Sequence, residues 1–136
     1  MRALAALATV TVLASCTTAP EPHHLSPRAQ QELSQLLAGK TAGPSVSCLP
    51  PYNANDMQII DGRNVAFRLG SRQTYLMQLS PGCHLLGAGN YALLTRQFGG
   101  MGMCQGDIAE VVDTSARMTV GSCAIDRIIP YTTAGR

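Results

Sequence analysis

Residues 56–69 read DMQIIDGRNVAFRL, two strand-forming runs on either side of an Asp-Gly-Arg turn at 61–63. An Asp-Gly pair between two such runs is typical of a β-hairpin. In the second run Val65, Phe67 and Leu69 occupy alternate positions, so their side chains lie on one face of a strand. We therefore expect a hairpin whose apolar face contributes to a buried core.

The same alternation recurs along most of the chain. The predicted strands are Asp56–Ile60, Asn64–Leu69, Thr74–Leu79, Tyr91–Arg96, Asp107–Asp113, Arg117–Gly121 and Ala124–Ile129. Turn residues separate them, and no internal repeat is visible. Five to seven short strands of this kind predict a mainly β fold, a small antiparallel barrel or sandwich.

One helix is predicted ahead of the strands, over residues 27–38. Ser26 suits the capping position, Pro27 suits the first helical position, and Gly39 suits the position just past the end. Leucines at helical spacing, beginning at Leu33, form a narrow apolar stripe. The stripe predicts that this helix packs against another element.

The first sixteen residues resemble an export signal. Arg2 is followed by an apolar run, Ala3–Ala14. As a helix this run would be about 18 Å long, well short of the roughly 30 Å hydrocarbon core of a membrane. Leu13-Ala14-Ser15-Cys16 resembles the lipobox of bacterial lipoproteins, in which the signal is cut before the cysteine and its thiol is acylated. We expect residues 1–15 to be removed and Cys16 to carry lipid, including palmitate, that anchors the protein to a membrane.

The residues after Cys16 divide into a tether and one domain. Residues 16–26 contain two prolines and little apolar content, which predicts an extended, mobile tether. Residues 27–136 are long enough for a single domain, with its β region at 47–131. Thr17, rather than Asp, follows Cys16, which resembles the outer-membrane address of lipoproteins. We therefore expect attachment at the outer membrane, with the domain facing the periplasm.

Four cysteines remain after Cys16, namely Cys48, Cys83, Cys104 and Cys123. An even number in an oxidising compartment favours two disulfides. No two of them are as close as the paired ligands of a zinc site usually are. Three pairings are possible, and we favour Cys83 with Cys104 and Cys48 with Cys123. This choice assumes that the chain after Cys83 runs out and returns to the same place at Cys104.

Composition and motifs exclude several classes of function. The formal net charge is +2 and there is no Trp; acidic and basic residues are interspersed. These features argue against a nucleic-acid partner. His84 is the only histidine in the predicted domain, and no nucleophile motif surrounds the nearby serines, so we expect no enzyme activity. No cofactor or small-molecule substrate is indicated.

Metal binding remains a weaker alternative. Met101 and Met103, with Cys104 and His84, could hold cuprous copper. The adjacent pair at 23–24, His-His, is a poor metal site in a mobile segment, so we predict no defined metal centre. The glycines on either side of Met101 predict a wide, mobile turn at 99–102.

A set of motifs resembles an uncharacterised family of small Gram-negative lipoproteins. The residues that carry the resemblance are Cys48-Leu49-Pro50, Asp61-Gly62-Arg63, Val65, Phe67, Tyr75, Leu79, Cys83 and Met103–Asp107. The similarity spans about residues 47–131 and rests on cysteines, turns and core positions. Met103 stands where a leucine is more usual, a volume-conserving change. The resemblance implies a shared fold and carries no catalytic residues.

Together these observations predict a lipid-anchored periplasmic protein that acts as a binding or envelope-structural module. An envelope protein is the expected partner, besides the membrane itself. Inhibition of a cell-wall-degrading enzyme is an alternative, because such inhibitors are often small cysteine-bridged β lipoproteins. The copper-binding module is a second alternative.

Overall fold

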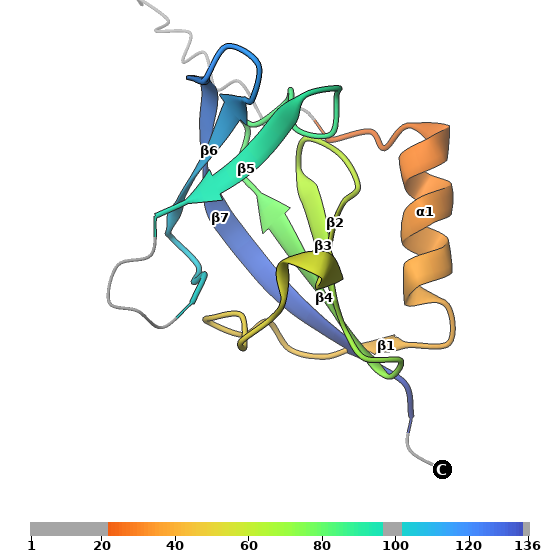
Figure 1. Ribbon diagram of the computed structural model, residues 1–136. Helices are drawn as coiled ribbons and strands as arrows, with labels where there is room; N and C mark the ends of the chain where they lie inside the picture. Colours follow the sequence, from red (N-terminus) through yellow and green to blue (C-terminus); the bar gives the residue numbers. More distant parts are fainter. Residues whose placement is uncertain (1–21, 97–101, 135–136) are drawn as a thin grey trace, which may run out of the picture.

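A computed structural model describes residues 22–96 and 102–134 (Figure 1). The elements are α1 (Pro27–Leu37), β1 (Thr41–Ala42), a short 3-10 helix (Ala54–Asp56), β2 (Met57–Ile59), β3 (Asn64–Leu69), β4 (Gln73–Leu79), β5 (Tyr91–Thr95), β6 (Ile108–Asp113) and β7 (Met118–Thr132). The fold is mainly β with one helix, as the sequence predicts.

All seven strands belong to one antiparallel sheet, in the order β2-β3-β4-β7-β6-β5, with β1 also paired to β7. β7 is the longest strand, with 15 residues, and it joins the two halves of the sheet. Its first part, up to Ala124, pairs with β6, and its second part, from Ile125, pairs with β4. The sheet curls along β7 into a half-barrel (Figure 1).

The main core fills the inner side of this curl. Val65 and Phe67 point inward from β3, and both are fully buried. They meet side chains from the facing half, including Val111 on β6 and Ile125 on β7. The aromatic ring of Tyr52 packs edge-on against Phe67, with ring centroids 4.8 Å apart. Side chains from both halves of the curl therefore share one apolar core.

The helix covers the opposite face of the sheet, over the β2–β4 half (Figure 1). Ala66 points outward from β3, between the two inward residues, because successive side chains of a strand alternate in direction. It is buried under α1 with Ala29 of the helix and Ile60 of the turn, and Leu33 packs against them. Small side chains at 29 and 66 allow the helix and the strand to approach closely.

Most predicted elements are confirmed with shifts of one or two residues at their ends. One difference concerns β7, which the sequence predicted as two strands broken near Gly121. The strand continues because Gly121 lies against the loop after β4, where an added Cβ would sit 2.6 Å from the carbonyl oxygen of Gly82. Gly121 therefore marks a close approach of two backbones rather than a strand end.

Two disulfides are present, but the predicted pairing is wrong. Cys48 is bonded to Cys104 and Cys83 to Cys123. β7 lies between β4 and β6, so the chain leaving β4 runs beside β7, where the amide of Ser80 donates to the carbonyl of Ala124. This places Cys83 next to Cys123.

Cys104 instead lies against the segment that precedes the 3-10 helix. The amide of Leu49 donates to Met103 O at 2.7 Å, and the amide of Gln105 donates to Ser47 O at 2.8 Å. These bonds form an antiparallel bridge between Cys48 and Cys104. The excursion after Cys83 returns to this bridge and not to its own starting point.

Some expectations concern residues that the structure does not describe. Cys16 and the residues before it lie outside the described ranges, and so does most of the predicted mobile turn at 99–102. Within residues 22–96 and 102–134, no helix combines the length and apolar character needed to cross a membrane.

Candidate functional site

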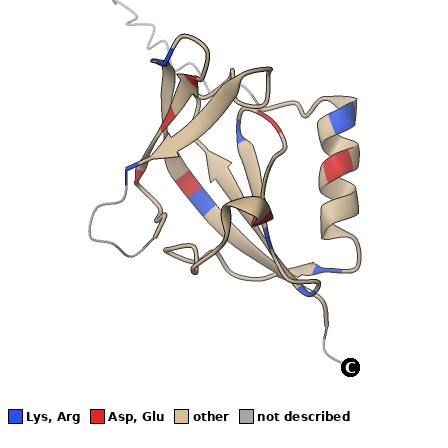
Figure 2. Cartoon of the chain, viewed as in Figure 1, with Lys and Arg blue, Asp and Glu red and all other residues tan. Residues whose placement is uncertain are grey.

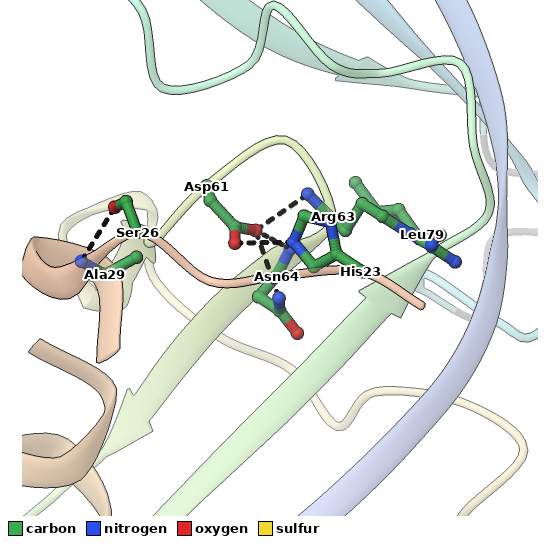
Figure 3. A network of polar contacts seen from close by, with 7 residues as sticks. All are labelled: His23, Ser26, Ala29, Asp61, Arg63, Asn64 and Leu79. Atoms are coloured by element: carbon green, nitrogen blue, oxygen red, sulfur yellow. Dashed lines mark hydrogen bonds and ion pairs between the residues drawn. The ribbon is translucent and has the colours of Figure 1, made fainter. Parts of the chain in front are cut away.

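The turn between β2 and β3 carries a network of polar contacts (Figure 3). Asp61 Oδ1 accepts from the backbone amides of Arg63 and Asn64, both at 2.8 Å, and from Asn64 Nδ2 at 3.0 Å. This is an Asx-type turn, in which the side chain replaces a backbone acceptor. Asn64 is itself buried, so the turn is held from beneath as well as by its own backbone.

The segment before the helix crosses this turn. His23 Nε2 lies 2.8 Å from Asp61 Oδ2, with side-chain exposures of 32% and 17% (Figure 3). Leu25 packs against the small cluster under α1, and Ser26 Oγ accepts from the amide of Ala29 to cap the helix. The sequence predicted a mobile tether as far as residue 26, whereas residues 22–26 lie against the domain.

The Arg63 side chain is restrained by a hydrogen bond from its Nε, while its terminal nitrogens form no ion pair among the described residues. Its Nε donates to Leu79 O at 3.1 Å, and its own carbonyl accepts from the amide of Leu79. Among the residues that the structure describes, no carboxylate lies within 4.0 Å of its guanidinium nitrogens. The terminal N–H groups of Arg63 therefore have no protein carboxylate as partner in the described part of the chain.

His84 reaches the same place from the other side. A Cβ added to Gly62 would lie 2.7 Å from His84 Cα and 2.9 Å from Cys83 O. Glycine at 62 is thus what allows the turn to lie directly against the chain after β4. The neighbouring bridge from Cys83 to Cys123 fixes that chain to β7.

These side chains surround a pocket of about 430 Å³. Its lining residues are His23, His24, Ser26, Asp61, Gly62, Arg63, Pro81, Gly82 and His84. The chain has three histidines, and all of them line this pocket. A second hollow of about 550 Å³ shares His23 and Arg63 and extends along the sheet past Leu33 and Tyr131. The volume of the first pocket is in the range typical of small-ligand sites.

Asp61 is the acidic group of this pocket. Burial raises the pKa of the Asp61 carboxyl, but hydrogen bonds from His23, the Arg63 amide and Asn64 outweigh it. The net result is a pKa below the ordinary value, so Asp61 is ionised at neutral pH. Figure 2 shows the other charged residues spread over the elements, with both signs interspersed.

The described residues include no group of three or more His, Cys, Asp or Glu side chains arranged to hold a metal ion. Of the residues considered for copper, Cys104 is bonded to Cys48, and Met103 is 2% exposed in the core. Met101 lies outside the described ranges.

Comparison with protein families gives one match. A model for a family of unknown function (DUF6491) matches residues 1–135. The chain belongs to this family. Curated proteins and solved structures give no match. The expectation of an uncharacterised family is therefore confirmed.

For this DUF6491 member the sequence motifs identify only part of the pocket. The Asp-Gly-Arg turn is visible in the sequence as a hairpin signal. The three histidines are far from it along the chain, and their convergence depends on the tether crossing the turn and on the close approach at Gly62. Of these features, only Gly62 has a local signal in the sequence. Its Asp-Gly context predicts a turn, and it does not reveal the close approach of the chain after β4.

Proposed function

We propose that this protein is a lipid-anchored periplasmic binding module, attached through lipid on Cys16 of its lipobox-like Leu13-Ala14-Ser15-Cys16 sequence. That sequence is the observation that carries the anchoring part of the proposal. The pocket beneath His23 supports the binding part, because rigid backbone holds its polar groups.

The anchor and the pocket are close along the chain. His23 is the seventh residue after Cys16. Even a fully extended chain of that length reaches only about 25 Å. A protein held by lipid on Cys16 would therefore keep this pocket near the membrane surface. Thr17 favours the outer membrane as the site of attachment.

Replacement of Cys16 tests the anchor. Cells expressing the full precursor should incorporate radiolabelled palmitate into the wild-type chain and place it in the membrane fraction. Cys16→Ser should abolish palmitate incorporation and leave unprocessed precursor, because only a thiol forms the thioether. Ser15→Ala is the matched control, since it keeps a small residue before the cysteine and should be labelled normally. Palmitate in the Cys16→Ser protein would contradict the proposal.

Site-specific photocrosslinking in intact envelopes tests the binding role. A photoreactive residue at His84 should give a discrete adduct that is absent with the same residue at Met118. Met118 lies on β7, is 57% exposed and does not line the pocket. Equal crosslinking at the two positions would contradict a binding role for the pocket.

A further inference from the structure

We propose that the pocket lined by His23, His24, Arg63 and His84 is an anion site that binds a phosphate group. The inference deepens the proposed binding function and rests on it for the source of the ligand. A phospholipid headgroup and free phosphate offer the same chemistry, and the experiment below distinguishes them.

Arg63 is the permanent positive charge of the site. Its Nε is occupied by Leu79 O, which restrains the side chain, while its terminal N–H groups meet no carboxylate among the described residues. A planar guanidinium with free N–H groups suits two oxygens of one phosphate. Because the Arg63 carbonyl is also bonded to Leu79, the turn presents this group without first having to become ordered.

The three imidazole rings add ring nitrogens that can donate to a phosphate oxygen. Two come from the segment before the helix and one from the chain after β4, so they border the pocket from different elements. The N-terminus of α1 begins beside them at Ser26, and its first turn has no acidic residue.

The carboxylate of Asp61 does not prevent an anion from binding in this pocket. Of the described lining residues it alone is acidic, and its oxygens already accept from the turn and from His23. It acts as a positioning residue that holds His23 at the edge of the pocket. The nearest acidic group of β7, Asp126, lines the adjoining hollow and not this pocket. Glu32 on α1 is paired with Arg28.

Histidine NMR on the full mature chain, kept in micelles of an uncharged detergent, tests the proposal. Inorganic phosphate should shift all three histidine ring signals with one common Kd. Arg63→Gln should weaken that Kd at least tenfold, and His84→Gln should weaken it without touching the Arg63–Leu79 hydrogen bond. Arg68→Gln is the matched control, because Arg68 is exposed on β3 and lines a different hollow.

A further titration distinguishes the two sources of the ligand. Glycerophosphoglycerol, the headgroup of an anionic phospholipid, should bind at least as tightly as inorganic phosphate if the ligand is a lipid, and more weakly if it is free phosphate.

The proposal is overturned if neither phosphate compound shifts the three signals together. It is also overturned if Arg63→Gln and Arg68→Gln have equal effects. None of these results depends on acylation. A failure of the anchor in the palmitate experiment is therefore distinguishable from a failure of the anion site.

Discussion

The two faces of the curled sheet are built in different ways. The inner face buries large side chains from both halves of the sheet, and the bridge from Cys83 to Cys123 lies within this core. The outer face buries fewer and smaller side chains: Ala29, Ile60 and Ala66 under α1, and Leu76 opposite Ala66 on β4, with partly exposed leucines around them. Buried apolar area dominates stability, so the inner face should hold the fold together and the outer face should contribute little.

The pocket lies where these two faces meet. Its floor, the Asp61 turn and the chain near Cys83, belongs to the strongly held inner structure. Its other wall, His23 and Ser26, belongs to the segment that continues into the weakly held helix. The comparison therefore predicts that one wall of the site can move while the other remains fixed.

The largest effect is expected from the inner disulfide. Replacing both Cys83 and Cys123 by Ala removes a bridge with a sequence separation of 40, worth about 4 kcal/mol in the chain-entropy model. Urea denaturation of the oxidised protein measures the loss. A loss below about 1 kcal/mol would show that the inner face does not depend on this bridge.

Truncating the central aromatic side chain should cost somewhat less. Phe67 is fully buried and contacts Tyr52, so Phe67→Ala leaves a cavity and should destabilise the protein by about 3 kcal/mol. The measurement is again the free energy of unfolding in urea. If Phe67→Ala proved no worse than Leu33→Ala on the helix, the two faces would not differ as described.

Removing the Asp61 side chain from the turn between β2 and β3 should lower the free energy of unfolding by an intermediate amount that depends on pH. Asp61→Ala removes three hydrogen bonds and the contact with His23, and should cost about 2 kcal/mol at pH 7. Asp113→Ala is the control, because Asp113 accepts from two amides in an exposed turn. We expect it to cost less than half as much.

The pH dependence follows from the lowered pKa of Asp61 in the folded state. The contribution of its charge is fully present above the unfolded-state value of about 3.9. It is lost as the pH falls below that value and through the folded-state pKa. The difference between wild type and Asp61→Ala should therefore be constant from pH 5 to 7 and shrink below about pH 4. A difference that grows on acidification would contradict the assignment.

The smallest effect is expected on the outer face. Leu33→Ala removes a partly exposed contact and should cost about 1 kcal/mol of global stability. Its local effect should be clearer, since amide exchange in α1 should accelerate while exchange in β3 and β4 hardly changes. Equal acceleration in helix and strands would mean that the two faces unfold as one unit.

The sequence was informative where a feature depends on neighbouring residues. Val65 and Phe67 alternate with Ala66, which is enough to predict a strand and its buried face. Ser26 and Pro27 likewise identify the start of the helix. Each of these signals is local, because side-chain alternation and capping act over a few residues.

Features that depend on strand order could not be predicted in this way. The pairing of Cys83 follows from the insertion of β7 between β4 and β6, which no spacing records. The same holds for the pocket, because His23 and His84 meet only after the tether crosses the turn. Gly121 was interpreted as a strand end because its reason, the nearby carbonyl of Gly82, lies on a different segment.

The pairing of the cysteines also bears on how the chain matures. Along the sequence the bonds interlace, since Cys83 lies between Cys48 and Cys104, and Cys104 lies between Cys83 and Cys123. Neither bond joins consecutive thiols. A chain oxidised in the order of its emergence, N-terminus first, would join Cys48 to Cys83 before either correct partner was present. That bond must then be exchanged through a mixed disulfide once β7 has arrived. The final strand of the sheet thus sets the earliest moment at which the correct covalent structure can form.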